Sequence, residues 1–584
     1  MTFQPIDSDR LRAALRAATG RLLGEMRPEG YWEGELSSSA LATATAVVAF
    51  AVNANERHGK LVHAGAAWLV EDQNADGGWG DSPESPSNLS TTMLAVAALT
   101  LRASDECASA LARADEYVTV HAGRPAGERV AAVTACYGKD RTFAAPILLT
   151  CAAAGLVPWG RVPPLPFELA ALPHAAYGAL RLRVVSYALP ALIAAGIAIH
   201  RHNPTRNPIT RTLRNLAAAR ALKKLDAIQP ASGGFLEAVP LTSFVAMSLA
   251  AAPLPGHPVT ARCLDFLARA ARPGGSWPID SNLSVWLTTN AVIALDAAGA
   301  LGEIDVGRTR RWLAAQQHTD THAYTGAAPG AWAWTHLPGG VPDADDTARA
   351  ALALSRMGGD ARSIAAGVGW LIDLQNKDGG WPTFCRGWGK LPFDRSSPDL
   401  TAHALQALDA AHPEKRDTRV RSAVDNGLEY LRRAQRADGS WAPLWFGNQL
   451  APGKLNPVLG TAAVLPALFE QRERAAADRG IAYLLGVQNP NGGWGGDNDI
   501  ASSVEETAAA VSALAQAPER DDVQAAAERG ASYLVGRVED GTWSAPAPIG
   551  LYFSSLWYSE RLYPIIWTVE ALGRIAARRR QIDG

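Results

Sequence analysis

Acidic side chains gather at the start of two short Ala-rich segments of the 584-residue chain. The first segment begins with three acids in four positions, Asp343, Asp345 and Asp346, and the second begins with Asp399, four residues before His403. One acid at a helix N-terminus commonly acts as a cap, because it accepts hydrogen bonds from free N–H groups and opposes the helix dipole. Three acids within four positions exceed what capping requires, so the first cluster indicates chemistry.

Crowding should change the protonation of these carboxyl groups. Neighbouring negative charges repel one another, so at least one aspartate of the cluster should keep its proton above the usual pKa of about 3.9. A carboxylic acid that stays protonated in an apolar cavity can act as a general acid. The cluster therefore predicts a proton donor, whereas His403 taken by itself fits a structural role equally well.

Four copies of one motif place turns along the chain. Each copy has an aromatic or apolar helix, then Gln, then Gly four residues later and Trp two residues after that Gly. Sequences such as Asn-Asp-Gly-Gly end a helix and turn the chain. We expect the Trp to pack over the joint and the Gln to hydrogen-bond a loose backbone end. The copies are Gln73/Gly77/Trp79, Gln375/Gly379/Trp381, Gln435/Gly439/Trp441 and Gln488/Gly492/Trp494, and degenerate copies end at Trp32, Trp277, Trp332 and Trp543.

A second pattern follows the turns: a Thr, small residues, and a large apolar residue seven positions after the Thr. Seven residues are two helical turns, so the pair marks one face of a short helix. Small residues between them allow the close packing that an inner ring of helices needs. The pairs are Thr43/Phe50, Thr92/Leu99, Thr242/Leu249, Thr288/Leu295, Thr347/Leu354, Thr401/Leu408, Thr461/Leu468 and Thr507/Leu514.

Each repeat is thus a pair of helices, about 50 residues long, that must stack on its neighbours to bury its apolar face. Such pairs form either an open solenoid or closed α/α barrels. The repeats are unevenly spaced, above all between residues 80 and 240, which favours two barrels. A chain of 584 residues is also too long for one core. We therefore predict an all-α protein.

The composition excludes several classes of function. The net charge of −2 gives no general field for nucleic acid. The five cysteines lack any CxxC pair, so neither a zinc site nor a disulfide framework is indicated, and a reduced cytosolic compartment fits best. Residues 1–20 carry several charges without a long apolar stretch, so they do not form a signal peptide.

The region from Phe143 to His200 is strongly apolar but broken by Pro and charged residues. Neither of its apolar runs has the roughly 18–20 uninterrupted residues that a transmembrane helix needs. Two alternatives remain open for it: buried core helices, or a surface that dips into one leaflet of a membrane.

The motifs together resemble those of the squalene–hopene and oxidosqualene cyclase family, over nearly the whole chain. The Gln…Gly-x-Trp repeats look like its QW motifs, Pro342–Ala348 (PDADDTA) matches its DxDD acid motif, and Asp399–His403 (DLTAH) is similar to its DVTAH segment. The resemblance implies two α/α barrels of the α6–α6 type with a large apolar cavity between them. Residues 1–29 and 276–584 would form the catalytic barrel, and residues 30–275 the inserted one, with an apolar membrane-facing region.

The resemblance also implies roles for the polar residues. Asp345 would donate a proton to a terminal alkene of a linear polyprene such as squalene, and His403 would orient that acid. Asp343, Asp346 and Asp399 would support its acidity. No Asp-Asp-x-x-Asp motif for magnesium is present, so the reaction should start by protonation, and we expect no metal and no cofactor.

Carbocations need stabilisation without a nucleophile, which aromatic faces provide. By motif position, Trp286, Trp334, Phe384 and Trp494 resemble the family's cavity residues, although ordinary core packing is an equal alternative for each. The chain departs from the family near its C-terminal end, where expected aromatics fall on Pro548, Leu556 and Ser559; Tyr552, Phe553, Trp557 and Tyr558 are candidates to replace them. An early-terminated or differently folded product is therefore expected rather than hopene.

Other functions remain as alternatives. One is a cyclase of a shorter prenyl substrate, either a prenylated aromatic or a diterpenyl diphosphate. Another is an isoprenoid-binding protein without catalysis, which three packed aspartates make less favourable. A zinc-dependent protein prenyltransferase β-subunit would need a Cys, His and Asp ligand set that the sequence lacks. For the cyclase we expect monotopic binding at the cytoplasmic face of the inner membrane, and we consider a homodimer.

Overall fold

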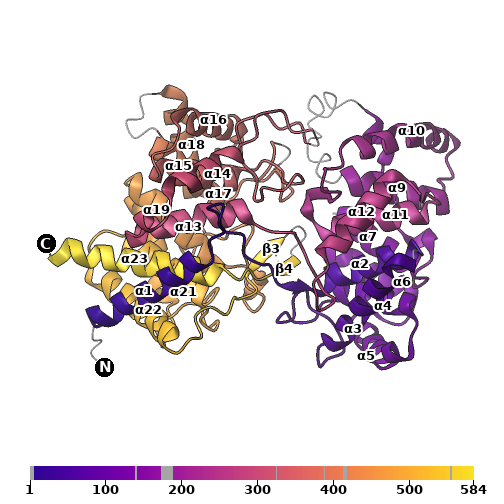
Figure 1. Cartoon of the computed structure of the whole chain (residues 1–584), viewed down its shortest axis with the longest axis horizontal. Helices are drawn as coiled ribbons and strands as arrows, with labels where there is room; N and C mark the ends of the chain where they lie inside the picture. Colours follow the sequence, from indigo (N-terminus) through magenta and orange to yellow (C-terminus); the bar gives the residue numbers. More distant parts are fainter. Residues whose placement is uncertain are drawn as a thin grey trace.

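The Ala-rich segments that follow the turns form the inner helices of two helical barrels, which lie side by side (Figure 1). Small side chains on these helices let their neighbours approach closely, as the Thr pattern predicts. The computed structural model describes residues 6–54, 56–138, 141–172, 189–254, 256–323, 325–386, 389–411, 417–552 and 556–583. The predicted all-α class with α/α barrels is confirmed.

The C-terminal barrel is a closed ring. Each inner helix packs against the next, and the last packs against the first. The inner helices described are α13 (Ser284–Ala298), α15 (Ala344–Arg356), α17 (Pro398–Ala411), α19 (Pro457–Glu470), α21 (Val504–Ala515) and α23 (Tyr563–Asp583). The outer helices are α14 (Val306–Ala315), α16 (Ala361–Leu374), α18 (Thr418–Ala434), α20 (Arg474–Gly486), α22 (Asp521–Glu539) and α1 (Ser8–Gly24).

The N-terminal barrel is built in the same way around its own inner helices, which pack against one another in turn. Its described inner helices are α2 (Ala40–Val52), α4 (Leu89–Arg102), α7 (Arg141–Ala153), α9 (Leu189–His202) and α11 (Val239–Ala251). Outside them lie α3 (Gly59–Glu71), α5 (Asp105–Ala122), α6 (Ala126–Tyr137), α10 (Pro208–Ala227) and α12 (Pro258–Ala270).

The other elements are short. Two antiparallel strand pairs form, β1 (Ser38–Ser39) with β2 (Trp277–Pro278) and β3 (Gly550–Tyr552) with β4 (Leu556–Tyr558). Figure 1 shows β3 and β4 between the two barrels, with α23 running from there to the far end of the C-terminal barrel. The 3₁₀ turns are η1 (Glu56–His58), η2 (Trp159–Arg161), η3 (Phe167–Ala171), η5 (Phe235–Glu237), η6 (Leu301–Glu303) and η7 (Pro452–Lys454).

The repeat motif makes one fixed set of hydrogen bonds. The indole N–H of Trp381 donates to the carbonyl of Leu371 (2.8 Å), and its backbone N–H donates to Oγ1 of Thr401 (3.1 Å). Gln375 donates to the carbonyls of Gly379 and of Ala423 in the next outer helix, 2.7 and 2.9 Å away. Equivalent bonds recur at Gln73/Trp79/Thr92, Gln435/Trp441/Thr461 and Gln488/Trp494/Thr507. The bond between Trp backbone N–H and Thr hydroxyl, here called the Trp–Thr bond, ties each turn to an inner helix.

Glycine is required at the turn. Gly379 has φ +91°, and a Cβ there would clash with the backbone carbonyl of Asn426 on the next outer helix. Both the left-handed conformation and the close approach therefore select Gly. The motif joins one repeat to the next as well as ending a helix.

Two of the Trp–Thr bonds connect segments that are far apart in the sequence. Trp32, which follows α1, donates to Thr288 of α13 (3.0 Å), and Trp277, which follows α12, donates to Thr43 of α2 (2.9 Å). Each bond therefore closes one barrel with a segment of that same barrel, just before the chain crosses to the other, and β1 pairs with β2 where the crossing segments meet. These contacts support the proposed insertion of one barrel in the other, and they favour crossings just after Trp32 and just after Trp277, a few residues beyond the predicted boundaries.

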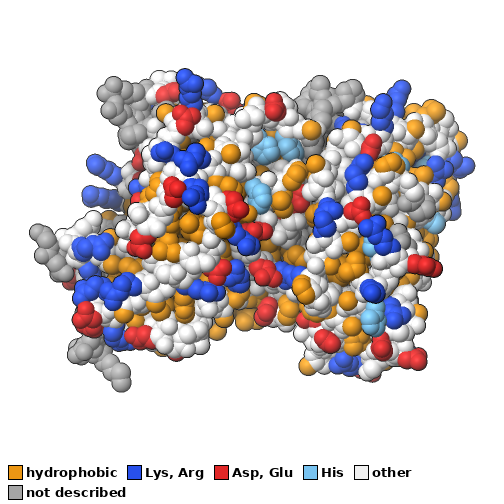
Figure 2. Space-filling model, in the orientation of Figure 1, with side chains coloured by type: hydrophobic (Ala, Val, Ile, Leu, Met, Phe, Trp, Pro, Cys, Tyr) orange, Lys and Arg blue, Asp and Glu red, His pale blue; other side chains and the backbone are white. Residues whose placement is uncertain are grey.

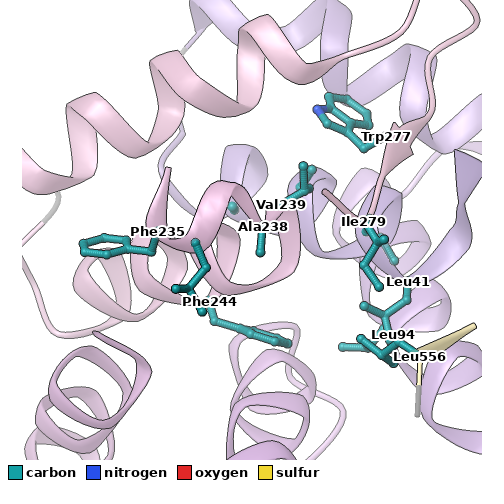
Figure 3. Close-up of a cluster of buried hydrophobic side chains, with 14 of the residues drawn as sticks. Leu41, Leu94, Phe235, Ala238, Val239, Phe244, Trp277, Ile279 and Leu556 are labelled. Atoms are coloured by element: carbon teal, nitrogen blue, oxygen red, sulfur yellow. The ribbon is translucent and has the colours of Figure 1, made fainter. Parts of the chain in front are cut away.

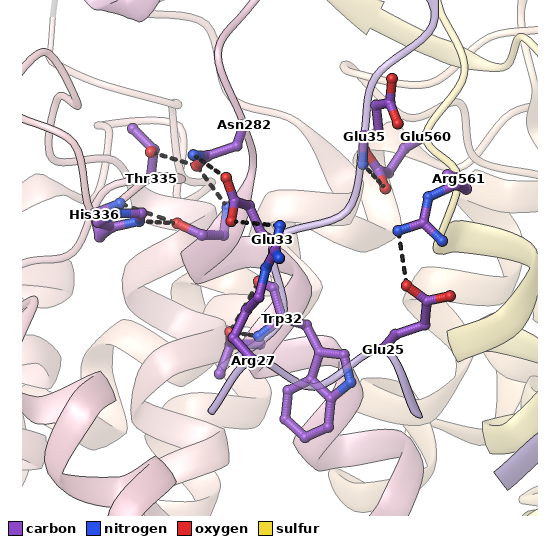
Figure 4. A network of polar contacts seen from close by, with 12 residues as sticks. Glu25, Arg27, Trp32, Glu33, Glu35, Asn282, Thr335, His336, Glu560 and Arg561 are labelled. Carbon is purple, nitrogen blue, oxygen red and sulfur yellow. Dashed lines mark hydrogen bonds and ion pairs between the residues drawn. The ribbon is translucent and has the colours of Figure 1, made fainter. Parts of the chain in front are cut away.

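Polar contacts fix the first crossing (Figure 4). Asn282 donates to Glu33 (3.4 Å) and accepts from the hydroxyl of Thr335 (2.7 Å). The backbone N–H of Glu35 donates to Glu560 (3.0 Å). The segment after Trp32 is thus held by residues that precede α13, α15 and α23.

An apolar seam joins the barrels beside the crossings (Figure 3). Leu556 of β4 packs with Leu41 and Leu94 from the inner helices of the N-terminal barrel, next to Ile279. All four side chains are at most 9% exposed, so the seam is a continuous core and contributes burial energy to the joint.

The apolar region from Phe143 to His200 is mostly interior where it is described. Residues 144–152 of α7 and 189–200 of α9 are buried inner-helix residues, while residues 173–188 lie outside the described residues. The expectation that these two runs form a membrane-facing surface is therefore wrong for α7 and α9, because their apolar side chains fill the barrel. Among the described residues, no helix is both long enough and apolar enough to span a membrane.

Replacing Thr288 by Val should destabilise the C-terminal barrel. The change removes the hydroxyl that accepts the buried N–H of Trp32, and an unsatisfied buried donor costs roughly 1–3 kcal/mol. We expect a lower urea midpoint by circular dichroism. Thr319→Val, at an exposed threonine, is the matched control and should leave the midpoint unchanged. Equal midpoints for Thr288→Val and the wild type would show that the bond does not hold the barrel closed.

Candidate active site

The repeat turn at Trp332 positions the acidic cluster. Trp332 donates its backbone N–H to Thr347 (3.0 Å) and accepts from the backbone N–H of Asp343 (3.0 Å). Asp343 is the N-cap of α15, and its carboxylate accepts the N–H of Asp346 (2.8 Å). The first turn of α15, which carries Asp345, is thus fixed from both sides.

Asp345 and His403 meet across two neighbouring inner helices. Nδ1 of His403 on α17 lies 2.5 Å from Oδ1 of Asp345 on α15. Asp399 lies one turn before His403, where it accepts hydrogen bonds from the Ser397 hydroxyl and from the N–H of Leu444. The five residues that the sequence predicts as catalytic, Asp343, Asp345, Asp346, Asp399 and His403, are brought together at the same end of α15 and α17.

Burial is the main cause of the altered acidity in the cluster. Burial raises the pKa of Asp343 to about 8. It also raises the pKa of Asp346 well above the usual value, and the negative charge of Asp343 raises that pKa further. Burial is also the largest cause of the raised pKa of Asp399, and the negative charge of Asp345 is the second. The sequence predicted like-charge repulsion as the cause, and the structure shows that loss of hydration is larger. Asp343 and Asp346 are therefore held largely protonated at neutral pH.

A largely aromatic hollow, here called the aromatic cavity, opens beside the acids. It encloses about 610 Å³, and Asp343, Asp345 and Asp346 form part of its wall. Trp334 and Phe384 meet edge to face across the wall, with ring centroids 6.2 Å apart. Its other aromatic residues are Trp286, Trp445, Phe446, Tyr552, Tyr558 and Tyr563. A cation formed here would meet ring faces rather than water.

A second, polar hollow lies inside the C-terminal barrel on the other side of Asp345, and we call it the lumen cavity. It has a volume of about 1190 Å³ and shares Trp286, Asp345 and Phe446 with the aromatic cavity. Arg349, one turn after Asp345, lines it and donates to Asn290 (2.6 Å). The acid therefore lies between an apolar and a charged compartment.

Two predicted cavity residues lie elsewhere. Trp494 is fully buried in a repeat turn, where its indole donates to Leu484 (2.8 Å), so it packs as a structural tryptophan. Trp557 lines neither of the two cavities. Its ring lies against Gly447, and its backbone N–H donates to Oδ2 of Asp81 (3.1 Å). Trp286, Trp334, Phe384 and Tyr552 do line the aromatic cavity as predicted, and Phe553 lies outside the described residues.

Sequence analysis missed Trp445, Phe446 and Tyr563 of the cavity wall. A signal for the first two was present: they follow Trp441 by four and five residues, in the segment between a repeat turn and the next inner helix. Trp334 and Phe384 lie in equivalent segments, two and three residues after Trp332 and Trp381. Among the described residues, no group of three His, Cys, Asp or Glu side chains could hold a metal ion.

Comparison with known proteins places both halves of the chain in one family. Residues 281–577 match the squalene–hopene cyclase C-terminal domain, and residues 15–237 match the squalene–hopene cyclase N-terminal domain. The fold also resembles that of the ent-copalyl diphosphate synthase from Streptomyces platensis. That structure has a TM-score of 0.58 and 20% identity, and the match covers 97% of this chain and 99% of the other.

Curated relatives match at modest identity. A terpene cyclase–glycosyl transferase fusion protein of Humicola fuscoatra is 25% identical over 100% of this chain and 51% of its own length. The drimenyl diphosphate synthase of Streptomyces showdoensis is 32% identical over 48% of this chain and 49% of its own length. The chain thus spans about half the length of each of these two relatives.

Asp343→Asn should change how stability depends on pH. Asn caps a helix as well as Asp does, so the cap is kept while the titration is removed. A carboxyl with a folded pKa of about 8 and an unfolded value of 3.8 stabilises the fold fully below pH 3.8, and this stability is lost as the pH rises through 8. We therefore expect the unfolding midpoint of the variant to rise relative to that of the wild type as the pH increases from about 4 to 8. Above pH 8 the difference between the two midpoints should stay constant.

Asp360→Asn is the matched control, because Asp360 caps α16 in the same way but is exposed. Its midpoint should follow the wild type over the whole range. A pH-independent difference for Asp343→Asn would contradict the buried, protonated state of that side chain.

Proposed function

We propose that this chain, which belongs to the squalene–hopene cyclase family, is a class II terpene cyclase, and that Asp345 starts cyclisation by protonating the terminal alkene of a linear polyprene. The observation that carries the proposal is the position of Asp345, which contacts His403 at 2.5 Å and forms part of the wall of the aromatic cavity. A proton donor must be within reach of the atom it protonates, and the cavity is where an apolar chain would bind.

The neighbouring groups support this role. Alkene protonation leaves a carboxylate on Asp345 and a cation on the substrate. His403, bonded to Asp345, orients the carboxyl group and interacts with the charge that develops on it. Asp343 and Asp346, held protonated by burial, add no full negative charge beside the acid. The rings of the cavity wall stabilise the cation, each by about 2 kcal/mol where water is excluded.

Two substrate classes are candidates. Squalene is the first, since both domain families that match the chain are those of squalene–hopene cyclases. A shorter prenyl diphosphate is the second, and one observation favours it: the relative at 32% identity is a drimenyl diphosphate synthase. The departures from the family at Pro548, Leu556 and Ser559 are consistent with early termination on either substrate.

Asp345→Asn should abolish turnover. Asparagine is nearly isosteric but cannot donate the proton, so we expect activity to fall by at least about a hundredfold. Squalene, farnesyl diphosphate, geranylgeranyl diphosphate and a geranylgeranylated benzoate are each incubated with purified protein, and the products are analysed by mass spectrometry. Circular dichroism checks that the variant is folded.

Asp373→Asn is the matched control, because Asp373 is a surface residue of α16 that pairs with Arg419. It should keep wild-type activity. If Asp345→Asn retained more than a tenth of the wild-type rate, another group would be the acid; if the wild-type protein consumed none of the four substrates, the chain would act as a binding protein.

We also propose that the protein binds the cytoplasmic face of the inner membrane, and that α10 makes the contact. Ile209, Leu213 and Leu216 lie on one face of α10 and are 71%, 56% and 71% exposed. Arg220 continues that face, and Figure 2 shows Lys and Arg side chains over this end of the molecule. Exposed apolar side chains beside basic residues suit an anionic lipid surface. A homodimer stays a prediction.

Vesicle flotation tests the membrane proposal. The wild-type protein should float with vesicles of phosphatidylglycerol and phosphatidylcholine, and replacing Ile209, Leu213 and Leu216 together by Ser should strongly reduce the bound fraction, because the buried apolar area is lost. Val120→Ser, at a residue of α5 that is 79% exposed, is the control and should float like the wild type. Undiminished flotation of the triple variant would assign the contact to another surface.

A further inference from the structure

A buried pair of acids lies at the joint between the barrels, on a different part of the chain from the proton-donating cluster. Asp280 follows β2 and forms an isolated bridge with Ala238, directly after Glu237 of η5. Asp280 is 0% exposed and Glu237 is 1% exposed. Neither acid has a role in the chemistry described above. Burying two neighbouring carboxyl groups lowers the stability of the fold, which suggests that the pair has a function.

Asp280 is connected to the aromatic cavity through one tyrosine. The hydroxyl of Tyr552 donates to Oδ2 of Asp280 at 2.6 Å, and Tyr552 on β3 forms part of the cavity wall. The other oxygen, Oδ1, is buried and has no donor in hydrogen-bonding geometry among the described residues, although the indole of Trp334 lies nearby. The site therefore offers a phenol toward the substrate with a carboxyl group directly behind it.

The surroundings bring the pKa of Asp280 close to neutral, so this carboxyl group can both accept and release a proton there. Burial raises its pKa to about 8, and the charge of Glu237 adds to the effect. Leu236 and Glu237 both have positive φ values, +57° and +53°, which ordinary side chains rarely adopt. This strained turn directs Glu237 to bonds with Ser232 (2.6 Å) and with the N–H of Gly339 (2.8 Å). Backbone strain of this kind is common at functional sites.

We propose that Tyr552 and Asp280 end the cyclisation by removing a proton from the last carbocation. The inference rests on the proposed function. A C–H bond next to the cationic carbon breaks, and its electron pair forms the C=C bond of the product. The step starts from the ionised form of Asp280: the phenol oxygen of Tyr552 takes that proton while its own proton passes to Oδ2 of Asp280, so that a neutral tyrosine and a carboxylic acid remain. Tyr552 is the catalytic group, and Asp280 acts through it.

The two ends of the reaction then balance. Asp345 loses one proton and Asp280 gains one, so the substrate is isomerised without net change in protons. Each carboxyl group is reset by exchange with solvent before the next turnover. The hydroxyls of Tyr558 and Tyr563, which also face the cavity, bond each other at 3.0 Å and have no comparable carboxylate behind them in the described residues.

The main rival as base is Asp345 itself, which becomes a carboxylate after it has protonated the alkene. Asp280→Asn and Tyr552→Phe separate the two assignments. The test uses whichever of the four substrates the wild-type protein cyclises, and it measures both the rate of substrate consumption and the ratio of the main alkene to all other products. Initiation still depends on Asp345, so consumption should fall less than the product ratio changes.

We expect both variants to shift the ratio by at least about tenfold, away from the wild-type alkene toward alcohols from water capture or toward isomeric alkenes. Asp280→Glu should restore the wild-type alkene in part, because it keeps the carboxylate. Unchanged ratios in both folded variants would assign the base to Asp345 and overturn the inference, as would a wild-type product that is only an alcohol.

Tyr483→Phe is the matched control. Tyr483 on α20 donates to Asp497 at 2.8 Å, which reproduces the Tyr–Asp pair away from both cavities. This variant should give wild-type rate and products, and a shift equal to that of Tyr552→Phe would overturn the assignment. Failure of the proposed function is recognised separately, because the wild-type protein would then form no cyclic product.

Discussion

The Trp–Thr bond is the interaction on which the rest of the structure depends. A buried backbone N–H must find an acceptor, and the hydroxyl of an inner-helix threonine supplies it in the four full repeats and at Trp32, Trp277 and Trp332. At Trp332 the threonine of this bond also helps to position the acidic cluster, because the Thr347 hydroxyl donates to the backbone carbonyl of Asp343 at 2.5 Å. The Trp–Thr bond that joins the repeats therefore also positions the proton donor, so the position of the acid depends on the geometry of the barrel.

The buried acids show how one environment serves two purposes. Loss of hydration keeps Asp343 and Asp346 protonated, which spares the cavity a concentration of negative charge. The same loss raises the pKa of Asp280 to about 8, where a carboxyl group can exchange a proton near neutral pH. Because the aromatic cavity is dry, weak groups become effective acids and bases there, and ring faces are sufficient to hold a cation.

The sequence predicted the elements that repeat, and it failed where the chain is irregular. Gln375, Gly379 and Trp381 belong to a pattern with fixed spacing, so their contacts follow from local rules. Trp494 matches the same pattern, and nothing in its spacing shows that it is a buried support rather than a cavity residue. The cavity wall comes from connecting segments of unequal length, and Trp445 reaches it through tertiary packing alone. Asp280 was missed for the same reason, since its partner Tyr552 is 272 residues away.

The crossed connections have a consequence for how the chain folds during synthesis. Helix α1 is synthesised before the whole N-terminal barrel, but it packs against α22 and α23, which are synthesised after that barrel. Its apolar face, with Leu11 and Leu22 at most 2% exposed in the finished protein, has no native partner while the N-terminal barrel assembles. Contacts of such long sequence separation form slowly. In the nascent chain this helix therefore lacks its partners until α22 and α23 have been synthesised, and the C-terminal barrel closes only after that point.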